Sequence, residues 1–182
     1  MSELFSIQLQ NRQQQGRDGV WLDLPTTTEQ VQAALRQIGI SSDNPQGLFI
    51  SGYFAEEEKR FAIPYNMVLA SNVDELNFLA SRLETLSTGE RAELNAALQA
   101  PQSELFSIGR ITDFPENVDY YVHLPDVHGP AQLGDYYLNR SGMVDMPEEW
   151  KGGIDTAQFG RYVAQQEQGV FTEYGYFVKS GD

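Results

Sequence analysis

Two kinds of residue that often carry chemistry are missing or scarce: the 182-residue sequence has no cysteine and only two histidines. Without cysteine there is no disulfide, thiolate metal site or cysteine nucleophile. His123 and His128 lack partners at a metal-ligand spacing, so we interpret both as structural residues. Phosphate-binding loops, nucleophile elbows and the zinc-protease motif are also missing. We therefore expect no metal, no cofactor and no catalytic residue.

Long apolar runs are absent as well. No stretch approaches the length required to span a bilayer, and residues 1–15 lack the basic and apolar regions of a secretory signal. These absences predict a cytoplasmic protein without a membrane segment.

Basic residues are few, with 12 Lys and Arg against 26 Asp and Glu and a net charge of -14. Such a surface repels nucleic-acid phosphates and attracts basic proteins. The alternative explanation is that the negative charge only keeps the protein soluble. An apolar content of 41%, with 10 Phe and 9 Tyr, is sufficient for hydrophobic cores. We expect a folded acidic protein that does not bind nucleic acid directly.

The first predicted domain, residues 1–61, is a three-stranded sheet that carries one helix. Thr26 followed by Glu29 is a capping-box pattern for the start of the helix, and Gly39 suits its end. The predicted elements are strands over residues 4–9, 20–24 and 48–50, and a helix with the apolar face Val31, Ala34, Leu35 and Ile38.

The second predicted domain, residues 62–102, is helical. Asn72 with Glu75, and Ser87 with Glu90, are further capping patterns. Their helices carry apolar stripes at helical spacing, which comprise Leu76, Leu79, Ala80 and Leu83, then Leu94, Ala97 and Leu98.

The third predicted domain, residues 103–182, begins with a repeat. Residues 103–108 match residues 2–7 letter for letter, which indicates either a duplicated strand or a coincidence. Further elements are a helix from Pro130, a helix capped by Asp155 with Phe159, Tyr162 and Val163 facing inward, and strands around Val170 and Tyr176. The predicted fold class is α+β, with three small domains in an elongated row.

Carboxylates are dispersed along the chain, and residues 104–155 hold 10 acids against three bases, a net of -7. Acids three or four residues apart on a helix, or two apart on a strand, lie roughly 5 to 7 Å apart, comparable with neighbouring DNA phosphates. We therefore predict a DNA-like acidic surface made of Glu56, Glu57, Glu58, Asp74, Glu75, Glu84, Glu90, Glu93, Asp113, Glu116, Asp119, Asp126, Asp135, Asp145, Glu148, Glu149 and Asp155.

The total charge sets the length of duplex that could be imitated. Duplex DNA carries one charge per ~1.7 Å, so the carboxylates of a dimer would match roughly 88 Å of duplex, and its net charge roughly 48 Å. Imitation of a long site would therefore require an elongated dimer.

Several motifs occur in a fixed order and resemble the ArdA antirestriction family over nearly the whole chain. Residues 19–25 resemble its tryptophan strand, and residues 74–80 its central helix. At Gly52, before Tyr53, the family usually carries an Asp, so one expected acid is missing. The strongest matches are Leu133 and Gly134, Tyr136 and Tyr137, Gly142, Ile154 and Asp155, Phe159 to Arg161, and Gly175 to Phe177.

The resemblance implies a non-catalytic inhibitor, made by mobile elements such as conjugative plasmids or transposons, that lets incoming DNA escape restriction. It also implies a three-domain curved protomer and a homodimer whose acidic face imitates bent B-form DNA. That face would occupy the DNA-binding groove formed by the specificity and modification subunits of a Type I restriction-modification enzyme.

Two alternatives remain open at this point. An acidic interaction module could inhibit another basic DNA-binding protein, such as a nucleoid protein or a regulator. Paired carboxylates such as Glu148 and Glu149 are also compatible with a small hydrolase.

Overall fold

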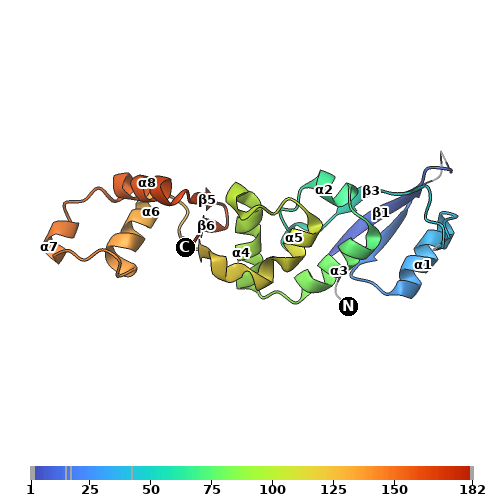
Figure 1. Ribbon diagram of the computed structural model, residues 1–182, viewed down its shortest axis with the longest axis horizontal. Helices are drawn as coiled ribbons and strands as arrows, with labels where there is room; N and C mark the ends of the chain where they lie inside the picture. The colour runs from blue at the N-terminus through green and yellow to red at the C-terminus, as the bar shows by residue number, and fades with distance from the viewer. Residues whose placement is uncertain (1–2, 15, 17, 42, 181–182) are drawn as a thin grey trace. The chain divides into compact units, whose positions relative to one another are not determined.

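A computed structural model describes residues 3–14, 16, 18–41 and 43–180. The chain forms two compact units, Met1–Ser87 with Phe106–Asp113 (unit 1), and Thr88–Leu105 with Phe114–Asp182 (unit 2). Each unit contains one three-stranded sheet and several helices (Figure 1). The predicted α+β class is confirmed, whereas the division into three small domains in a row stays a prediction.

The sheet of unit 1 comprises β1 (Phe5–Asn11), β2 (Val20–Leu24) and β3 (Leu48–Phe54), in the antiparallel order β2-β1-β3. Side chains alternate along β1, so that Phe5 and Ile7 are buried while Ser6 between them is only partly covered. All three predicted strands are confirmed, and β3 continues four residues beyond the predicted end at residue 50.

Helix α1 (Thr28–Gln37) begins one residue later than its capping pattern predicts. The N-cap is Thr27, whose hydroxyl accepts a hydrogen bond from the Gln30 N–H at 3.4 Å. Thr26 is held differently: its N–H donates to Asn77 Oδ1 at 2.7 Å, and its carbonyl accepts from Asn77 Nδ2 at 3.0 Å. The prediction of Thr26 as the cap was wrong because Asn77 fixes the backbone of Thr26 from another helix.

The remaining elements of unit 1 are η1 (Glu57–Lys59), α2 (Tyr65–Leu69), α3 (Val73–Glu84) and α5 (Ile108–Asp113). Asn72 caps α3 as predicted, since its side chain accepts from the Glu75 N–H at 2.9 Å. The predicted apolar stripe of α3 is confirmed, and α3 packs against α5 and β2. The fully buried stripe comprises Leu76, Leu79, Ala80 and Leu83.

Residues 103–108 do not repeat the strand that their letters share with residues 2–7. Ser103 ends the short helix η2 (Pro101–Ser103), and Glu104 adopts a left-handed conformation with φ 56°. Phe106 is 70% exposed and Ile108 already belongs to α5, whereas Phe5 is buried in β1. The duplicated-strand interpretation was wrong, because residues 6–9 have strand partners on both sides and residues 103–108 have none among the described strands.

Unit 2 contains a second antiparallel sheet, in the order β4-β6-β5. The two strands predicted near the C-terminus and the two helices before them are confirmed. The elements are α4 (Thr88–Gln99), η2, η3 (Phe114–Glu116), η4 (Val118–Tyr120), β4 (Tyr121–Leu124), α6 (Pro130–Asp135), the π-helical η5 (Tyr136–Arg140), α7 (Glu148–Lys151), α8 (Thr156–Glu167), β5 (Val170–Thr172) and β6 (Gly175–Lys179).

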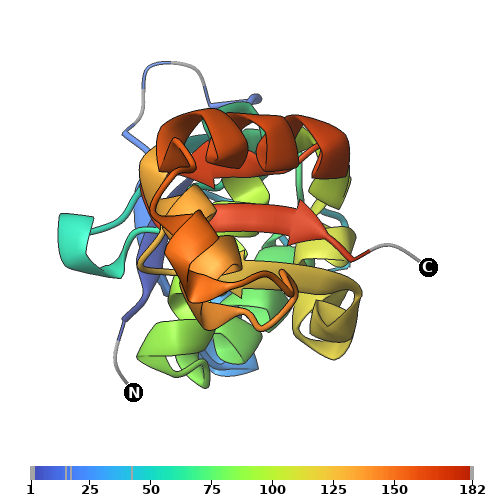
Figure 2. The same ribbon diagram turned by 90° about the vertical axis from the view of Figure 1, so that its left-hand side faces the viewer.

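Helices α6 and α8 pack so closely that their backbones meet (Figure 2). A Cβ atom at Gly160 would lie 1.8 Å from the carbonyl oxygen of Pro130, and one at Gly134 would lie 1.9 Å from that of Thr156. No side chain fits at either position. Two glycines of the motifs Leu133-Gly134 and Phe159-Gly160 therefore serve the packing of this helix pair.

The inward face of α8 differs from the predicted one at Tyr162, which is 60% exposed. Gly160 and Ala164 are buried, and Val163 packs against the core between them. Tyr162 follows Gly160 by two residues, which places it on the other side of the helix. The prediction that Tyr162 faces inward was therefore wrong. The core here comprises Val127, Leu133, Ala164, Tyr176 and Val178.

Candidate functional site: exposed carboxylates

The predicted acidic residues are distributed over both units. All are exposed except Glu93 and Asp135, which are partly buried. Unit 1 contains Glu56, Glu57, Glu58, Asp74, Glu75, Glu84 and Asp113. Unit 2 contains Glu90, Glu93, Glu116, Asp119, Asp126, Asp135, Asp145, Glu148, Glu149 and Asp155.

Negative charge is concentrated in unit 2. By sequence it holds 14 acids against five bases, a net of -9, whereas unit 1 holds 12 acids against seven bases, a net of -5. One base neutralises at most one acid, so the excess in unit 2 persists whatever ion pairs form. Nearly two thirds of the charge of the chain therefore belongs to this unit.

Among the described residues, the carboxylates in local ion pairs include Glu56, Asp135 and Glu148. Their partners lie three to five residues away and are exposed or partly exposed, and such pairs contribute little to stability. The pairs are Glu56 with Lys59 at 3.1 Å, Asp135 with Arg140 at 3.1 Å, and Glu148 with Lys151 at 2.6 Å.

Three acids of unit 2, on α4 and η4, lie near enough to one another for their charges to interact. Burial raises the pKa of Glu93, and the nearby charges of Glu90 and Asp119 raise it further. Like charges held close together oppose folding. Glu90, Glu93 and Asp119 are therefore neighbouring acids whose charges oppose one another.

Two of the predicted acids also support local structure. Asp155 caps α8 by accepting a hydrogen bond from the Gln158 N–H at 3.0 Å, as predicted. Asp135 accepts from Asn139 Nδ2 at 2.8 Å, in addition to its ion pair. Substitution of either residue would therefore change the fold as well as the charge.

Sequence reasoning left out several exposed acids that the structure places on the surface. The signal that could have found them is simple, because each lies in a loop, at a helix start or on the polar face of a strand. They are Glu3, Asp18, Asp23, Glu29, Asp43, Glu104 and Glu173.

Gly52, where the family pattern has an Asp, lies in the middle of β3 against Trp21 of β2. A Cβ atom there would lie 3.0 Å from Cη2 of Trp21 and 3.2 Å from Cβ of Gln8. Both contacts are tighter than ordinary packing. The indole ring of Trp21 therefore occupies space that an Asp side chain at position 52 would need.

The histidines show no catalytic arrangement. Nε2 of His123 lies 2.7 Å from the carbonyl oxygen of Tyr174, which joins β4 to the β5–β6 turn. The part of the chain that the structure describes contains no group of three potential metal ligands. Over the same residues, no helix combines the length and the apolar character that crossing a membrane demands.

The two sheets, their helices and the exposed carboxylates define an acidic α+β protein. The sequence profile of the antirestriction protein ArdA matches residues 15–178. The chain therefore belongs to the ArdA family of antirestriction proteins. A search among curated proteins found no match.

Proposed function

We propose that this chain is a DNA mimic that occupies the DNA-binding groove of Type I restriction-modification enzymes and so blocks restriction of incoming DNA. The proposal deepens the family assignment, which establishes an antirestriction protein. The observation that carries it is the excess charge of unit 2, -9, together with the exposure of most of its described carboxylates.

The physical basis is competition for a basic groove. A protein that binds DNA holds a surface of Lys and Arg, to which exposed carboxylates at phosphate-like spacing are complementary. Besides burial, the charges of Glu90 and Asp119 raise the pKa of Glu93, and a basic partner would lower this repulsion. Base-specific contacts are not required, so inhibition should extend across recognition sequences.

The proposal includes a homodimer, because one chain carries half of the charge needed for a long site. It also includes action in the cytoplasm on the specificity and modification subunits, without direct binding to nucleic acid. Catalysis plays no part, since the chain would act by occupying the groove.

The test is cleavage of unmodified plasmid by a purified Type I enzyme, titrated with the protein at two salt concentrations. Binding of the protein to the enzyme and release of DNA are followed in parallel. We expect stoichiometric inhibition, displacement of DNA, and a weaker effect at the higher salt concentration.

The opposite result would be a folded sample that inhibits none of several Type I enzymes. The alternative would then be an acidic module directed at another basic DNA-binding protein, which the same displacement assay would reveal with a nucleoid protein in place of the enzyme.

A further inference from the structure

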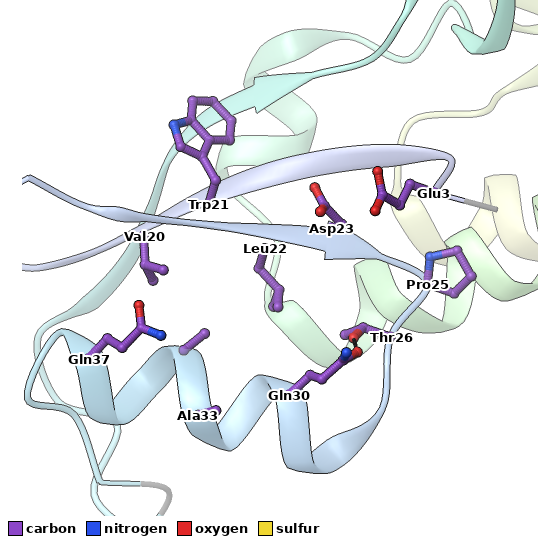
Figure 3. Close-up of a pocket in the computed structure, with 11 residues that line it drawn as sticks. Glu3, Val20, Trp21, Leu22, Asp23, Pro25, Thr26, Gln30, Ala33 and Gln37 are labelled. Carbon is purple, nitrogen blue, oxygen red and sulfur yellow. Dashed lines mark hydrogen bonds between the residues drawn. The ribbon is translucent and has the colours of Figure 1, made fainter. Parts of the chain in front are cut away.

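Unit 1 contains a groove of about 430 Å³ between β2 and α1 (Figure 3). Four consecutive residues of β2, residues 20–23, line it from one side. Gln30, Ala33 and Gln37 line it from the helix. The groove therefore follows the length of the strand and is not a pit at one end of it.

The strand that borders this groove lies at the edge of its sheet. β2 pairs with β1 on one side, and no described strand pairs with its other side. An edge strand presents unpaired N–H and C=O groups, to which an extended peptide can add as a further strand. The geometry of the groove is thus suited to a peptide backbone.

The two faces of β2 differ in chemistry. Val20 and Leu22 point toward α1, where Ala33 adds to an apolar surface, whereas Trp21 and Asp23 point to the opposite side of the strand (Figure 3). A peptide paired with β2 would place alternate side chains on these two faces. One set would meet Val20 and Ala33 beside the polar Gln30 and Gln37, whereas the other would meet an acidic surface.

The acidic surface favours basic side chains. Glu3 and Asp23 both line the groove and are exposed, and no described Lys or Arg lines it. Trp21 is 50% exposed, so its ring can receive a cation on its face. Charge complementarity therefore selects Lys or Arg at the peptide positions that face Trp21 and Asp23.

We propose that this groove binds an extended segment of a partner protein, in which apolar and basic residues alternate, by strand addition to β2. The proposal is independent of DNA mimicry, because it concerns the edge of one sheet in unit 1 and a peptide backbone. It gives the chain a second binding surface.

A labelled eight-residue peptide of alternating Val and Lys is the probe, and fluorescence anisotropy with the full chain is the measurement. We expect saturable binding, together with NMR shifts of the backbone amides of residues 20–24. Two further peptides carry N-methyl groups at alternate residues, one at the odd and the other at the even positions. One of the two should bind at least about tenfold more weakly than the unmodified peptide, because it has lost the N–H donors that face β2.

Matched variants test the charge. The double substitution Glu3→Gln and Asp23→Asn should weaken binding about fivefold, whereas Asp18→Asn with Asp43→Asn, which removes the same charge elsewhere in unit 1, should change it less than about twofold. Glu3→Gln alone, at an exposed residue outside any helix or strand, guards against misfolding and should show part of the loss.

Three results would overturn the proposal. The first is the absence of binding by the Val-Lys peptide. The second is a failure of either comparison, that is, equal affinity for both N-methylated peptides or equal effects of the two double variants. The third is a shift of the β2 amides with protein concentration alone, which would make a second copy of the chain the occupant of the groove.

Discussion

The hydroxyl of Tyr137 donates a hydrogen bond of 2.5 Å to the carboxylate of Glu167, and that carboxylate accepts a second, of 2.9 Å, from Tyr176. Glu167 ends α8, Tyr137 lies in η5, and Tyr176 is fully buried in β6. Three elements of unit 2 therefore meet at one acid that is only partly exposed.

Replacement of Glu167 should destabilise the protein. In Glu167→Gln the amide nitrogen cannot accept a hydrogen bond, so one tyrosine hydroxyl loses its acceptor and the free energy of unfolding should fall by about 1 to 3 kcal/mol. Chemical denaturation measures the change. Gln166→Ala, at an exposed position of the same helix, should change stability by less than about 0.5 kcal/mol, and an equal loss there would contradict the assignment.

Stability should also fall at alkaline pH. Burial, and then the hydrogen bond and charge of Glu167, raise the pKa values of Tyr137 and Tyr176 above their ordinary value. The unfolded chain releases these protons from about pH 10, while the folded chain retains them, so the stabilisation is complete below pH 10 and is lost as pH rises further.

Denaturation series between pH 8 and pH 11.5 would show this loss, at up to about 1.4 kcal/mol per pH unit for the buried Tyr176. Tyr137 should contribute less because it is partly exposed. Tyr137→Phe should reduce the slope, and a constant free energy of unfolding up to pH 11.5 would refute the argument.

Gly160 should not tolerate even a methyl group. In Gly160→Ala the new Cβ would lie 1.8 Å from the Pro130 carbonyl oxygen, so α6 and α8 would have to separate, and we expect a loss of about 3 kcal/mol or more. Thermal unfolding provides the measurement. Gly109→Ala is the matched control, because that helical position is open and alanine should stabilise by up to about 1 kcal/mol.

Gly52→Asp should lower stability, although it restores the acid of the family pattern. The added side chain must displace Trp21 or Gln8, which costs about 1 to 3 kcal/mol. In a Trp21→Ala background the same substitution should cost less, and this coupling is measured by a double-mutant cycle. Additive losses would show that Trp21 is not the obstacle.

Local patterns predicted much of this fold, and tertiary contacts explain the failures. Asn72 and Asp155 cap their helices as their spacing indicated, because an N-cap depends on three neighbouring residues. Thr26 failed as a cap because Asn77, 51 residues away, binds its backbone. Residues 103–108 failed as a strand because a strand requires a partner that identical letters do not supply.

The acidic surface was partly predictable for a similar reason. Carboxylates are exposed unless a specific partner buries them, so composition alone predicted that most of the acids are exposed. What composition cannot supply is the role of an individual acid. Glu167 was not distinguished from the others, because its two tyrosine partners lie 30 and 9 residues away in the sequence.

Inhibition of a Type I enzyme should depend on several carboxylates of unit 2 together. Neutralisation of any one, such as Asp126→Asn, should change the inhibitory concentration less than about fivefold, because an exposed charge contributes at most about 1 kcal/mol. Reversal of Asp126, Asp145 and Glu149 to Lys should abolish inhibition, because it changes the charge of unit 2 from -9 to -3. The cleavage assay at low salt measures both effects.

The matched control reverses three acids outside the predicted surface, Glu3, Asp18 and Asp43, which changes the net charge of the chain by the same amount, from -14 to -8. All six residues are exposed, and none is a helix cap or a partner in an ion pair described above, so both triple variants should fold. Inhibition should survive in the control. If both variants lose inhibition equally, the total charge determines binding and the surface of unit 2 does not. Long-range attraction depends on the charge of the whole molecule, whereas occupation of a groove depends on where the charges lie.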